Sequence, residues 1–245
     1  MKVSLVTNIL QANERIAEQN KRLFDEKGIL TINIMSAPGA GKTTLIEQTI
    51  QALKNEYQIA VIEGDIQSTY DADKIAATGV PVVQINTGGA CHLDGNMISQ
   101  TFDQFNFDAM DLLIIENVGN LVCPAEFNVG EDFKVMLLSV PEGDDKPYKY
   151  PGMYHGVDAL VINKVDLLPY VPFNMEYFRR GVEILNPGVL TFPLSCRTGE
   201  GLEAWLAPVA AIALDVCRDQ RVLAKQLFGL TVQPVLALNF LPETG

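Results

Sequence analysis

A short glycine-rich segment carries the residue types needed to hold a nucleoside triphosphate. It runs from Ser36 to Thr43 with the sequence SAPGAGKT, between an apolar run, Leu30 to Met35, and a helix-like stretch that starts at Thr44. In a loop between a strand and a helix, backbone N–H groups and a lysine bind the phosphates, and a threonine hydroxyl ligates Mg²⁺. Ser36 replaces the usual first glycine, and the flanking elements compensate for this departure. The residues expected to hold the phosphates are Pro38, Gly39, Ala40, Gly41, Lys42, Thr43 and Thr44.

A second motif, Asn163-Lys164-Val165-Asp166, follows the apolar run Ala159 to Ile162 and favours GTP over ATP. The Asp166 carboxylate can accept two hydrogen bonds from guanine, whereas adenine presents acceptors there and would leave a buried charge without a partner. Asn163 is expected to contact the base and brace the loop, and the Lys164 stem to lie along the ring. The segment Ser195-Cys196-Arg197 is expected to give a backbone N–H to the guanine carbonyl oxygen.

Carboxylates at the ends of two further apolar runs complete an expected magnesium site. Asp65 follows the run Gln58 to Glu63, and Glu116 ends the run Asp111 to Glu116. With the Thr43 hydroxyl, they offer the oxygen ligands that Mg²⁺ prefers. We therefore expect Thr43, Asp65 and Glu116 to hold Mg²⁺ beside the triphosphate.

The segment Glu116 to Gly119 corresponds to the Asp-x-x-Gly γ-phosphate sensor of GTPases, with glutamate as the acidic residue. The Gly119 N–H is expected to bond the γ-phosphate, so hydrolysis would release the residues that follow. Asn120 stands where GTPases commonly carry a water-orienting glutamine, which predicts slow intrinsic hydrolysis to GDP. The expected catalytic groups are Lys42, Asp65, Glu116 and Gly119.

Two cysteines and a histidine form a candidate site for a softer metal. Cys91 and His92 follow two glycines in a predicted loop, and Cys123 lies four residues after Gly119, in the segment expected to move. Thiolate and imidazole ligands suit Zn²⁺ and Ni²⁺. Adjacent Cys and His side chains in an extended loop are expected to diverge, so the residues alone leave open a structural role for the thiols.

The composition limits the partners and the cellular location. The 245-residue chain has a net charge of −12, from 18 basic and 30 acidic residues, which argues against a nucleic-acid partner. No apolar run approaches the roughly 20 residues that cross a bilayer, and Met1 to Asn8 lack signal-peptide features. Four cysteines are too few for a disulfide framework. We therefore expect a cytoplasmic protein without a membrane partner.

Seven short apolar runs alternate with helical stretches, which predicts a mainly parallel central sheet with helices on both faces. The ligand loops of such sheets lie at the carboxyl ends of the strands, where the motifs above fall. We expect an α/β fold of the P-loop NTPase type. The runs are Leu30–Met35, Gln58–Glu63, Pro81–Ile85, Asp111–Glu116, Phe133–Val140, Ala159–Ile162 and Val189–Pro193.

Residues 1–245 are expected to form a single GTPase domain with two extensions. An N-terminal amphipathic helix is predicted at about residues 4–27, because apolar side chains recur from Leu5 onward and Gly28 follows. A C-terminal tail is predicted at about residues 225–245, where the helical pattern fades. Its last residues, Leu241 to Gly245, match a sortase signal with no apolar anchor behind it, which we interpret as a coincidence or an added tag.

Longer segments of the chain resemble the hydrogenase nickel-incorporation GTPases, the HypB family, which belong to the SIMIBI class of P-loop GTPases. The resemblance covers about Leu30 to Leu206. It implies a GTPase that delivers Ni²⁺ to the large subunit of a [NiFe] hydrogenase, together with a partner metallochaperone. The segments that carry it are Gly88–Asp94 (GGACHLD), Glu116–Pro124 (ENVGNLVCP), Glu142–Pro147 (EGDDKP) with Lys149–Pro151 (KYP), and Asn163–Leu167 (NKVDL).

The resemblance also implies a homodimer that forms when GTP is bound. Cys91, His92 and Cys123 are then interfacial ligands for Ni²⁺ or Zn²⁺, and two subunits complete one coordination sphere. Some family members carry a Cys-rich N-terminal nickel site or a His-rich storage stretch. This chain has no cysteine before Cys91 and only 2 histidines, so metal storage is not expected.

Two other interpretations use some of the same residues. A GTP-dependent chaperone or regulator of another metalloenzyme, similar to the urease-accessory or mutase-chaperone GTPases, would leave the thiols structural. The Cys-Pro-His metal motif of the urease accessory GTPases is absent. A small-molecule kinase would need the phosphate loop but has no use for Asn163 to Asp166.

Overall fold

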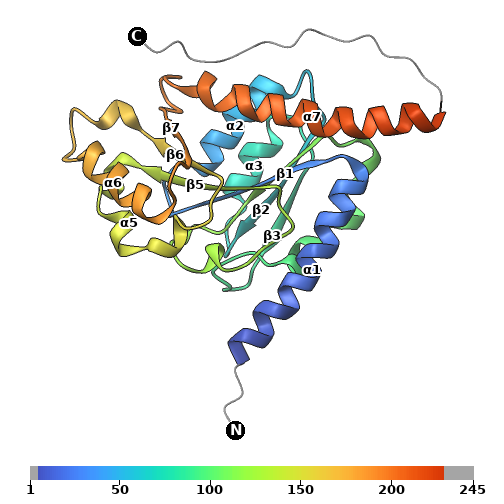
Figure 1. The fold of residues 1–245 in the computed structure, drawn as a ribbon, viewed down its shortest axis with the longest axis horizontal. Helices are drawn as coiled ribbons and strands as arrows, with labels where there is room; N and C mark the ends of the chain where they lie inside the picture. Colours follow the sequence, from blue (N-terminus) through green and yellow to red (C-terminus); the bar gives the residue numbers. More distant parts are fainter. Residues whose placement is uncertain (1–4, 229–245) are drawn as a thin grey trace.

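Seven parallel strands form one sheet in the order β3-β2-β4-β1-β5-β6-β7. The computed structural model describes the backbone of residues 5–228 and the side chains of residues 9–214 and 216. Figure 1 shows helices on both faces of the sheet, so the predicted α/β class with a parallel sheet is confirmed. The strands are β1 (Leu30–Ser36), β2 (Ile59–Asp65), β3 (Val82–Asn86), β4 (Leu112–Glu116), β5 (Phe133–Ser139), β6 (Ala159–Asn163) and β7 (Leu190–Pro193).

The helices differ from the prediction mainly at their ends. Helix α2 begins at Lys42, two residues before the predicted start at Thr44, so the glycine-rich loop leads directly into its first turn. Helix α7 continues to Phe228, past the predicted start of the tail at residue 225. Residues 229–245, with the sortase-like match, lie outside the described residues. The helices are α1 (Leu5–Lys27), α2 (Lys42–Leu53), α3 (Tyr70–Ala76), α4 (Gly95–Ser99), α5 (Lys146–Lys149), α6 (Met175–Leu185) and α7 (Leu202–Phe228).

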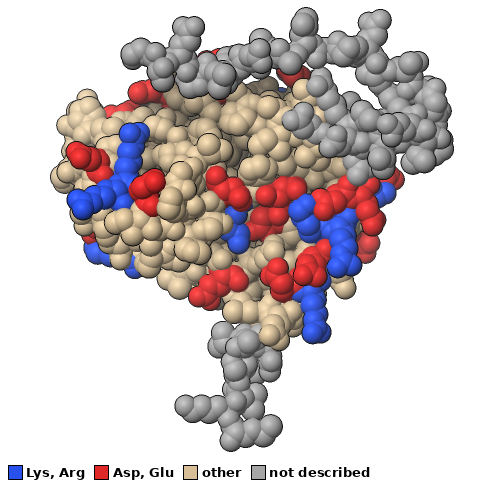
Figure 2. Space-filling model, viewed as in Figure 1, with Lys and Arg blue, Asp and Glu red and all other residues tan. Residues whose placement is uncertain are grey.

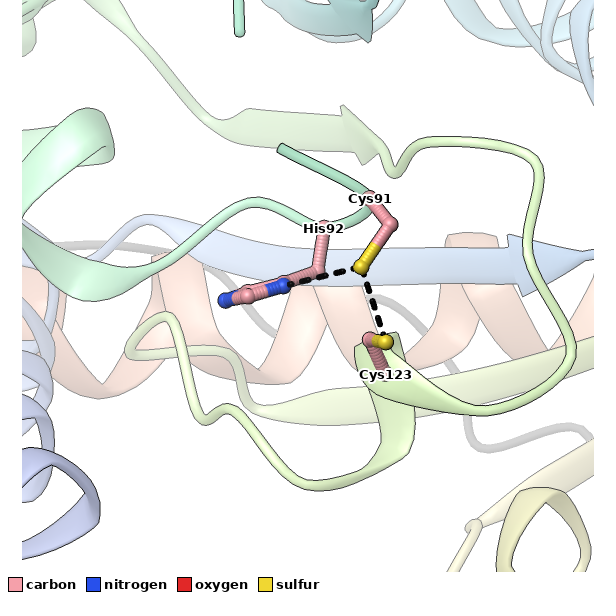
Figure 3. Close-up of side chains that lie close together, drawn as sticks. All are labelled: Cys91, His92 and Cys123. Carbon is pink, nitrogen blue, oxygen red and sulfur yellow. Dashed lines mark hydrogen bonds between the residues drawn. The ribbon is translucent and has the colours of Figure 1, made fainter. Parts of the chain in front are cut away.

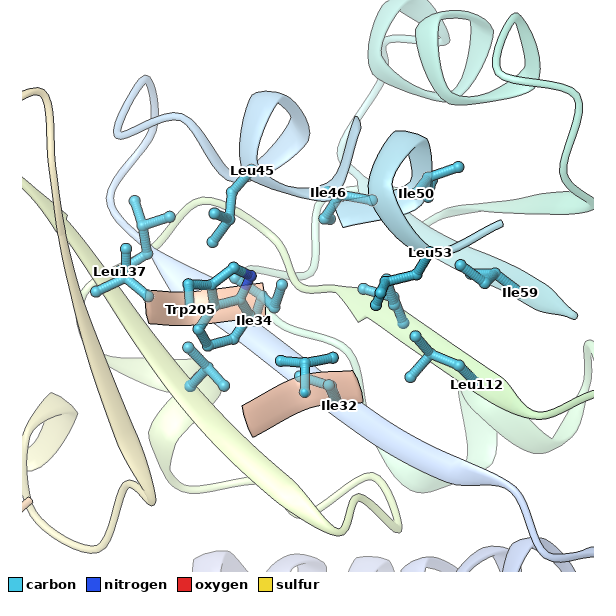
Figure 4. Packing of buried hydrophobic residues seen from close by; sticks show 14 of the residues in the cluster. Ile32, Ile34, Leu45, Ile46, Ile50, Leu53, Ile59, Leu112, Leu137 and Trp205 are labelled. Carbon is cyan, nitrogen blue, oxygen red and sulfur yellow. The ribbon is translucent and has the colours of Figure 1, made fainter. Parts of the chain in front are cut away.

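Helices α2 and α7 cover one face of the sheet. Alternate residues of β1, Ile32 and Ile34, pack on this side, as the two-residue period of a strand requires. Figure 4 shows Trp205 of α7 among these side chains, and its Nε1–H donates to Thr49 Oγ1 of α2 at 3.0 Å. Each isoleucine or leucine buried here contributes about 1.5–3 kcal/mol. This packing fixes α2, and with it the phosphate loop, against β1.

Helices α1 and α6 cover the opposite face. Met35 of β1 and Leu138 of β5 belong to one cluster with Phe178 of α6. Phe24 of α1 belongs to another cluster with Ile115 of β4. Helix α1 therefore covers the half of the sheet that contains β4 and β2, and α6 covers the half that contains β5 and β6.

The surface over α1 carries both signs of charge. Figure 2 shows Lys and Arg side chains beside Asp and Glu side chains on this face. Lys21 lies 2.9 Å from Asp132, and Arg22 lies 3.6 Å from Glu18. This face therefore has no continuous basic stripe of the kind that binds nucleic acid. Among residues 5–228, no helix is long and apolar enough to span a membrane.

Candidate nucleotide and metal sites

A cavity of about 470 Å³ opens at the carboxyl ends of β1, β2 and β4. Parallel sheets bind ligands at this edge. The cavity brings together most of the residues predicted to bind phosphate and Mg²⁺, and it adds three charged residues that the prediction missed, Glu63, Asp71 and Lys74. The predicted residues on its wall are Pro38, Gly39, Gly41, Lys42, Thr43, Thr44, Asp65, Glu116, Gly119 and Lys164.

The glycine-rich loop has a backbone shape that larger residues rarely adopt. Gly39 has φ 74° and Gly41 has φ 110°. A Cβ on Gly41 would lie 2.4 Å from Nδ2 of Asn163, so the loop and the end of β6 approach too closely for any side chain there. At the first position of the loop, the Ser36 hydroxyl accepts a hydrogen bond from Lys42 Nζ at 3.1 Å. The serine therefore holds the lysine in place within the cavity.

Glu116 lies at the end of β4 and is only 3% exposed. Its Oε1 accepts a hydrogen bond from Thr43 Oγ1 at 2.8 Å, while its Oε2 is buried with no hydrogen-bond partner among the described residues. Burial raises the pKa of Glu116 to about 7, although the nearby Lys42 charge opposes this shift. Burial also lowers the pKa of Lys42. An unpaired carboxylate oxygen beside a threonine hydroxyl is suited to a hard cation.

Glu63 adds a second buried carboxylate that sequence reasoning missed. It pairs with Glu116 in the register of β2 and β4 and is 2% exposed. Burial, and then the charge of Glu116, raise the pKa of Glu63 to about 8. Asp65, two residues later on β2, accepts hydrogen bonds at its Oδ1 from the backbone N–H groups of Gln67 and Ser68. Two residues span one full period of a strand, so this spacing was the signal that Glu63 shares the side of Asp65.

Asn163 joins the phosphate loop to the two segments predicted to recognise guanine. Its Nδ2 donates to Ala40 O at 3.0 Å, and its Oδ1 accepts from the backbone N–H groups of Lys164 and Cys196. The Lys164 ammonium donates to Gly39 O at 2.7 Å, which places the lysine stem over the loop. A single buried amide therefore fixes the relative position of three loops.

The proposed base site has one unsatisfied acceptor. The Asp166 Oδ1 atom is buried and has no hydrogen-bond partner among the described residues. In the segment after β7, the N–H of Ser195 donates to Glu200 O, and the N–H of Cys196 donates to Asn163. Of the three residues predicted to meet the guanine carbonyl, Arg197 is the one whose N–H is not used by these contacts. Burial raises the pKa of the Cys196 thiol to about 11, so this thiol is protonated at neutral pH.

Cys91, His92 and Cys123 lie together, with their ligand atoms within 4.8 Å of one another. The two sulfur atoms are 2.8 Å apart, and Cys91 Sγ lies 3.7 Å from His92 Nδ1 (Figure 3). The expectation that Cys91 and His92 diverge is therefore wrong for this loop. The His92 ring stacks on Phe127, with centroids 3.8 Å apart, and its Nδ1 faces the Cys91 sulfur atom.

The electrostatics of this cluster suit a metal that displaces protons. The hydrogen bond to Cys91, followed by burial, raises the pKa of the Cys123 thiol to about 11, so the metal-free thiol is protonated. Burial lowers the pKa of His92, which keeps a lone pair on the imidazole at neutral pH. A bound metal would take thiolates from both cysteines and release their protons. Three ligands from one chain leave a tetrahedral ion one position short.

Asn117 connects the phosphate sensor to the metal cluster. Its side chain is 0% exposed, and its Oδ1 accepts from the Leu93 N–H at 3.0 Å and from the Val118 N–H at 2.9 Å. Its Nδ2 donates to Asn33 Oδ1 on β1 at 3.2 Å. Leu93 follows His92 directly, so one amide holds the sensor and the metal loop together. The sequence prediction assigned no role to this side chain.

The residues after Asn117 lie against the phosphate loop. A Cβ on Gly119 would lie 3.0 Å from the Pro38 Cα, so the sensor glycine is in contact with the loop. The Asn120 N–H donates to Ser36 O at 2.8 Å, and Asn120 Oδ1 accepts from the Val122 N–H at 2.7 Å. The chain from Gly119 to Cys123 is thus a short hydrogen-bonded path between the two sites.

Comparisons with known proteins agree with this geometry. The family model for the CobW/HypB/UreG nucleotide-binding domain matches residues 30–192. The hydrogenase maturation factor HypB of Azotobacter chroococcum is 47% identical over 205 residues, which cover 84% of this chain and 67% of that protein. The hydrogenase/urease maturation factor HypB of Helicobacter pylori is 40% identical over 205 residues, with coverage of 82% and 84%. A crystal structure of HypB from Helicobacter pylori in complex with nickel has a TM-score of 0.79 and 38% identity, and the match covers 83% of this chain and 96% of that one.

The matches cover most of this chain and all of its main motifs. The chain spans about two thirds of the length of the Azotobacter relatives. The segment matched by the family model contains the phosphate loop, the sensor, the guanine motif and all three ligands of the metal cluster. The resemblance predicted from the sequence is therefore confirmed, and the chain belongs to the CobW/HypB/UreG family of nucleotide-binding proteins and, within it, to the HypB hydrogenase maturation factors.

Proposed function

We propose that this chain is a GTP-hydrolysing metallochaperone that delivers nickel during the maturation of a [NiFe] hydrogenase. The observation that carries this proposal is that Asn117, within the phosphate sensor, accepts a hydrogen bond from the Leu93 N–H, next to the cluster of Cys91, His92 and Cys123. Thiolate and imidazole ligands suit Ni²⁺ as cargo, and they also suit Zn²⁺. A movement of the sensor on loss of the γ-phosphate would reach the metal loop through one buried side chain.

The nucleotide would lie with its phosphates in the cavity at the start of α2. Thr43, Asp65 and Glu116 would hold Mg²⁺, and the buried Oε2 of Glu116, which has no protein partner among the described residues, supports this assignment. When bound, Mg²⁺ neutralises charge on the phosphate oxygens. The guanine would satisfy the unpaired Asp166 Oδ1, and a backbone N–H such as that of Arg197 would meet its carbonyl oxygen.

Hydrolysis is expected to be slow without an activating partner. Lys42 and the Gly119 N–H would stabilise charge on the γ-phosphate, and Asp65 or Glu116 would assist through a water. The Asn120 amide oxygen is held by the Val122 N–H, so this side chain is not positioned to orient the attacking water. The GTP-bound state would therefore be long-lived and would act as a switch, because bound GTP is hydrolysed slowly.

A second copy of the chain would complete the metal site when GTP is bound. One chain supplies three ligand atoms, and these are only partly buried, so a symmetry-related surface can reach the open position. The dimer would pass nickel, in the cytoplasm, to the hydrogenase large subunit with the help of a partner metallochaperone. Hydrolysis would separate the copies and release the ion.

Nickel transfer tests this proposal. Isotopically labelled Ni²⁺ is loaded on the purified full chain, which is then mixed with the large-subunit precursor and either GTP, GDP or a non-hydrolysable GTP analogue. We expect transfer with GTP and retention with the analogue, and we expect Cys123→Ala to hold little nickel. Val122→Ala, at the exposed neighbour of Cys123, is the matched control and should transfer normally. Equal transfer in all three nucleotide states would overturn the proposal.

A role toward a second nickel enzyme is the other candidate. The similar Helicobacter pylori protein is named as a maturation factor of both hydrogenase and urease. The same assay with a urease precursor distinguishes the two acceptors, because a chain specific for hydrogenase would leave that precursor without labelled nickel.

A further inference from the structure

Both loops that carry metal ligands continue into segments held by the N-terminal helix α1. The loop with Cys91 and His92 reaches α4 at Gly95, and the loop with Cys123 reaches Asn128 and Val129 before β5. We infer that Asn13 and Asn20 of α1 are positioning residues that clamp these two loops and thereby set the spacing of the Cys91 and Cys123 sulfur atoms. The inference rests on the metal function proposed above, and it assigns a role to helix α1, which contains none of the nucleotide-binding or metal-binding motifs.

Each of the two asparagine side chains contacts both loops. Asn13 Oδ1 accepts from the Gly95 N–H at 2.7 Å, and Asn13 Nδ2 donates to Asn128 O at 2.8 Å. Asn20 Nδ2 donates to Gly95 O at 2.7 Å and to Val129 O at 3.2 Å. Two amides about two turns apart on one helix therefore bridge the same pair of loops, with both polar atoms of the Gly95 backbone engaged.

The packing around these amides leaves little room for movement. Ala17 lies between them on the same face of α1 and is fully buried, and Asn13 and Asn20 are 8% and 2% exposed. A Cβ on Gly95 would lie 3.0 Å from the Ala17 N atom, and one on Gly130 would lie 2.9 Å from the Ala17 O atom. Both loops thus touch the helix through glycine, where the backbones approach most closely.

The chemistry explains why asparagine stands at both positions. Asn13 supplies one acceptor and one donor, and Asn20 supplies two donors. A primary amide can do both, whereas a hydroxyl has only one donor, too few for Asn20, and an ionised carboxylate has none. A buried backbone group that loses its hydrogen-bond partner destabilises the folded arrangement in which it stays buried. If the amides are lost, the two loops are expected to separate, and the sulfur atoms, now 2.8 Å apart, separate with them. Nothing in the clamp contacts the phosphate loop, so nucleotide binding is expected to remain.

The test uses Co²⁺ alone as a spectroscopic probe on the full chain, with the thiolate-to-metal absorption as the readout. Positioning residues of metal sites commonly change affinity by about 10–100-fold when removed, and we expect Asn20→Ala to weaken Co²⁺ binding within this range. Asn96→Ala, an exposed asparagine beside Gly95, is the matched control and should bind Co²⁺ as the unaltered chain does. GTP affinity should be equal in all three proteins.

A second measurement needs no metal. Oxidised glutathione converts the Cys91 and Cys123 thiols to a disulfide, with reduction of one glutathione disulfide for each bond formed, and the rate reports how often the sulfur atoms meet. We expect this rate to fall about tenfold in Asn13→Ala, which keeps both bonds of Asn20 and is the variant to use if Asn20→Ala does not fold.

The outcomes separate this inference from the proposed function. If the unaltered chain binds no Co²⁺ through its thiols, the proposed metal function fails. If the unaltered chain binds Co²⁺, and folded Asn20→Ala or Asn13→Ala shows unchanged affinity and disulfide rate, only the clamp is refuted. If GTP affinity falls in parallel with Co²⁺ affinity while Asn96→Ala is normal, α1 supports the whole fold and the specific clamp is likewise refuted.

Discussion

Replacement of Asn117 by alanine is the perturbation that should separate nucleotide binding from control of the metal site. The change removes three buried hydrogen bonds, to Leu93, Val118 and Asn33. Leaving buried backbone groups unpaired costs about 1–3 kcal/mol each, so we expect the free energy of unfolding to fall by about 3 kcal/mol or more. The phosphate loop is untouched, and the folded variant should still bind GTP.

The effect on coupling follows from the Leu93 contact alone. A neutral hydrogen bond contributes about 1 kcal/mol net, and about 1.4 kcal/mol corresponds to a tenfold change in affinity. If this bond forms in only one nucleotide state, its loss reduces the ratio of metal affinities between the GTP-analogue and GDP states by about fivefold. The assay is Ni²⁺ titration in each state. By linkage, the effect of Ni²⁺ on nucleotide affinity must shrink by the same factor.

Asn33→Ala is the matched control for lost stability. It removes the partner of Asn117 Nδ2 but leaves the Leu93 contact in place, so stability should fall while the affinity ratio is kept. The reasoning is refuted if Asn117→Ala folds, binds GTP and retains the full ratio of metal affinities, or if Asn33→Ala abolishes that ratio equally.

Three further predictions concern the individual sites. Gly41→Ala should abolish GTP binding measured with a fluorescent analogue, because its Cβ would lie 2.4 Å from Asn163 Nδ2 at a φ of 110°; normal binding would contradict the loop geometry. Asp166→Ala should lower GTP affinity and leave ATP affinity unchanged in competition experiments, whereas an equal loss for both would remove guanine recognition from this residue. Ni²⁺ affinity should rise with pH from 6.5 to 7.5, by about tenfold for each thiol proton released, because the pKa of Cys123 is raised to about 11. A Ni²⁺ affinity of the unaltered chain that does not change with pH, and that is the same in Cys123→Ala, would exclude thiolate ligation.

The sheet and the nucleotide motifs could be predicted because their signals are local in the sequence. Apolar runs such as Ala159 to Ile162 match strand β6, which ends at Asn163, one residue later than the run. The glycine-rich loop and the Asn163 to Asp166 motif each lie within a few residues of a strand end. The predicted start of α2 at Thr44 was two residues late. Helix α2 begins at Lys42, inside the glycine-rich motif, and the helix propensities of these residues do not mark that boundary.

The metal site could be predicted only in part, because its geometry depends on contacts between distant segments. The sequence supplied Cys91, His92 and Cys123 but predicted that the first two diverge. In the folded chain His92 stacks on Phe127, and the buried Asn117 amide accepts from the N–H of the neighbouring Leu93. The Asn117 amide has no sequence signature for such a bridge, since two of its partners, Leu93 and Asn33, lie 24 and 84 residues away in the chain.

Glu63 was missed for a related reason. Glu63 ends an apolar run, as Glu116 does, but its burial beside Glu116 follows from the register of β2 with β4, which the sequence does not give. Burial then raises the pKa of both groups. The spacing to Asp65 puts Glu63 on the same side of the strand, but it does not show that Glu116 lies beside it.

The central claim is that the terminal phosphate of GTP controls the affinity of the Cys91, His92 and Cys123 cluster. Its most direct test is Ni²⁺ titration of the unaltered chain in the presence of Mg²⁺ with either GDP or a non-hydrolysable GTP analogue. We predict affinities that differ by at least fivefold between the two states, the lower end of typical coupling between sites. Identical affinities in both states would contradict the account, whatever the nickel affinity itself.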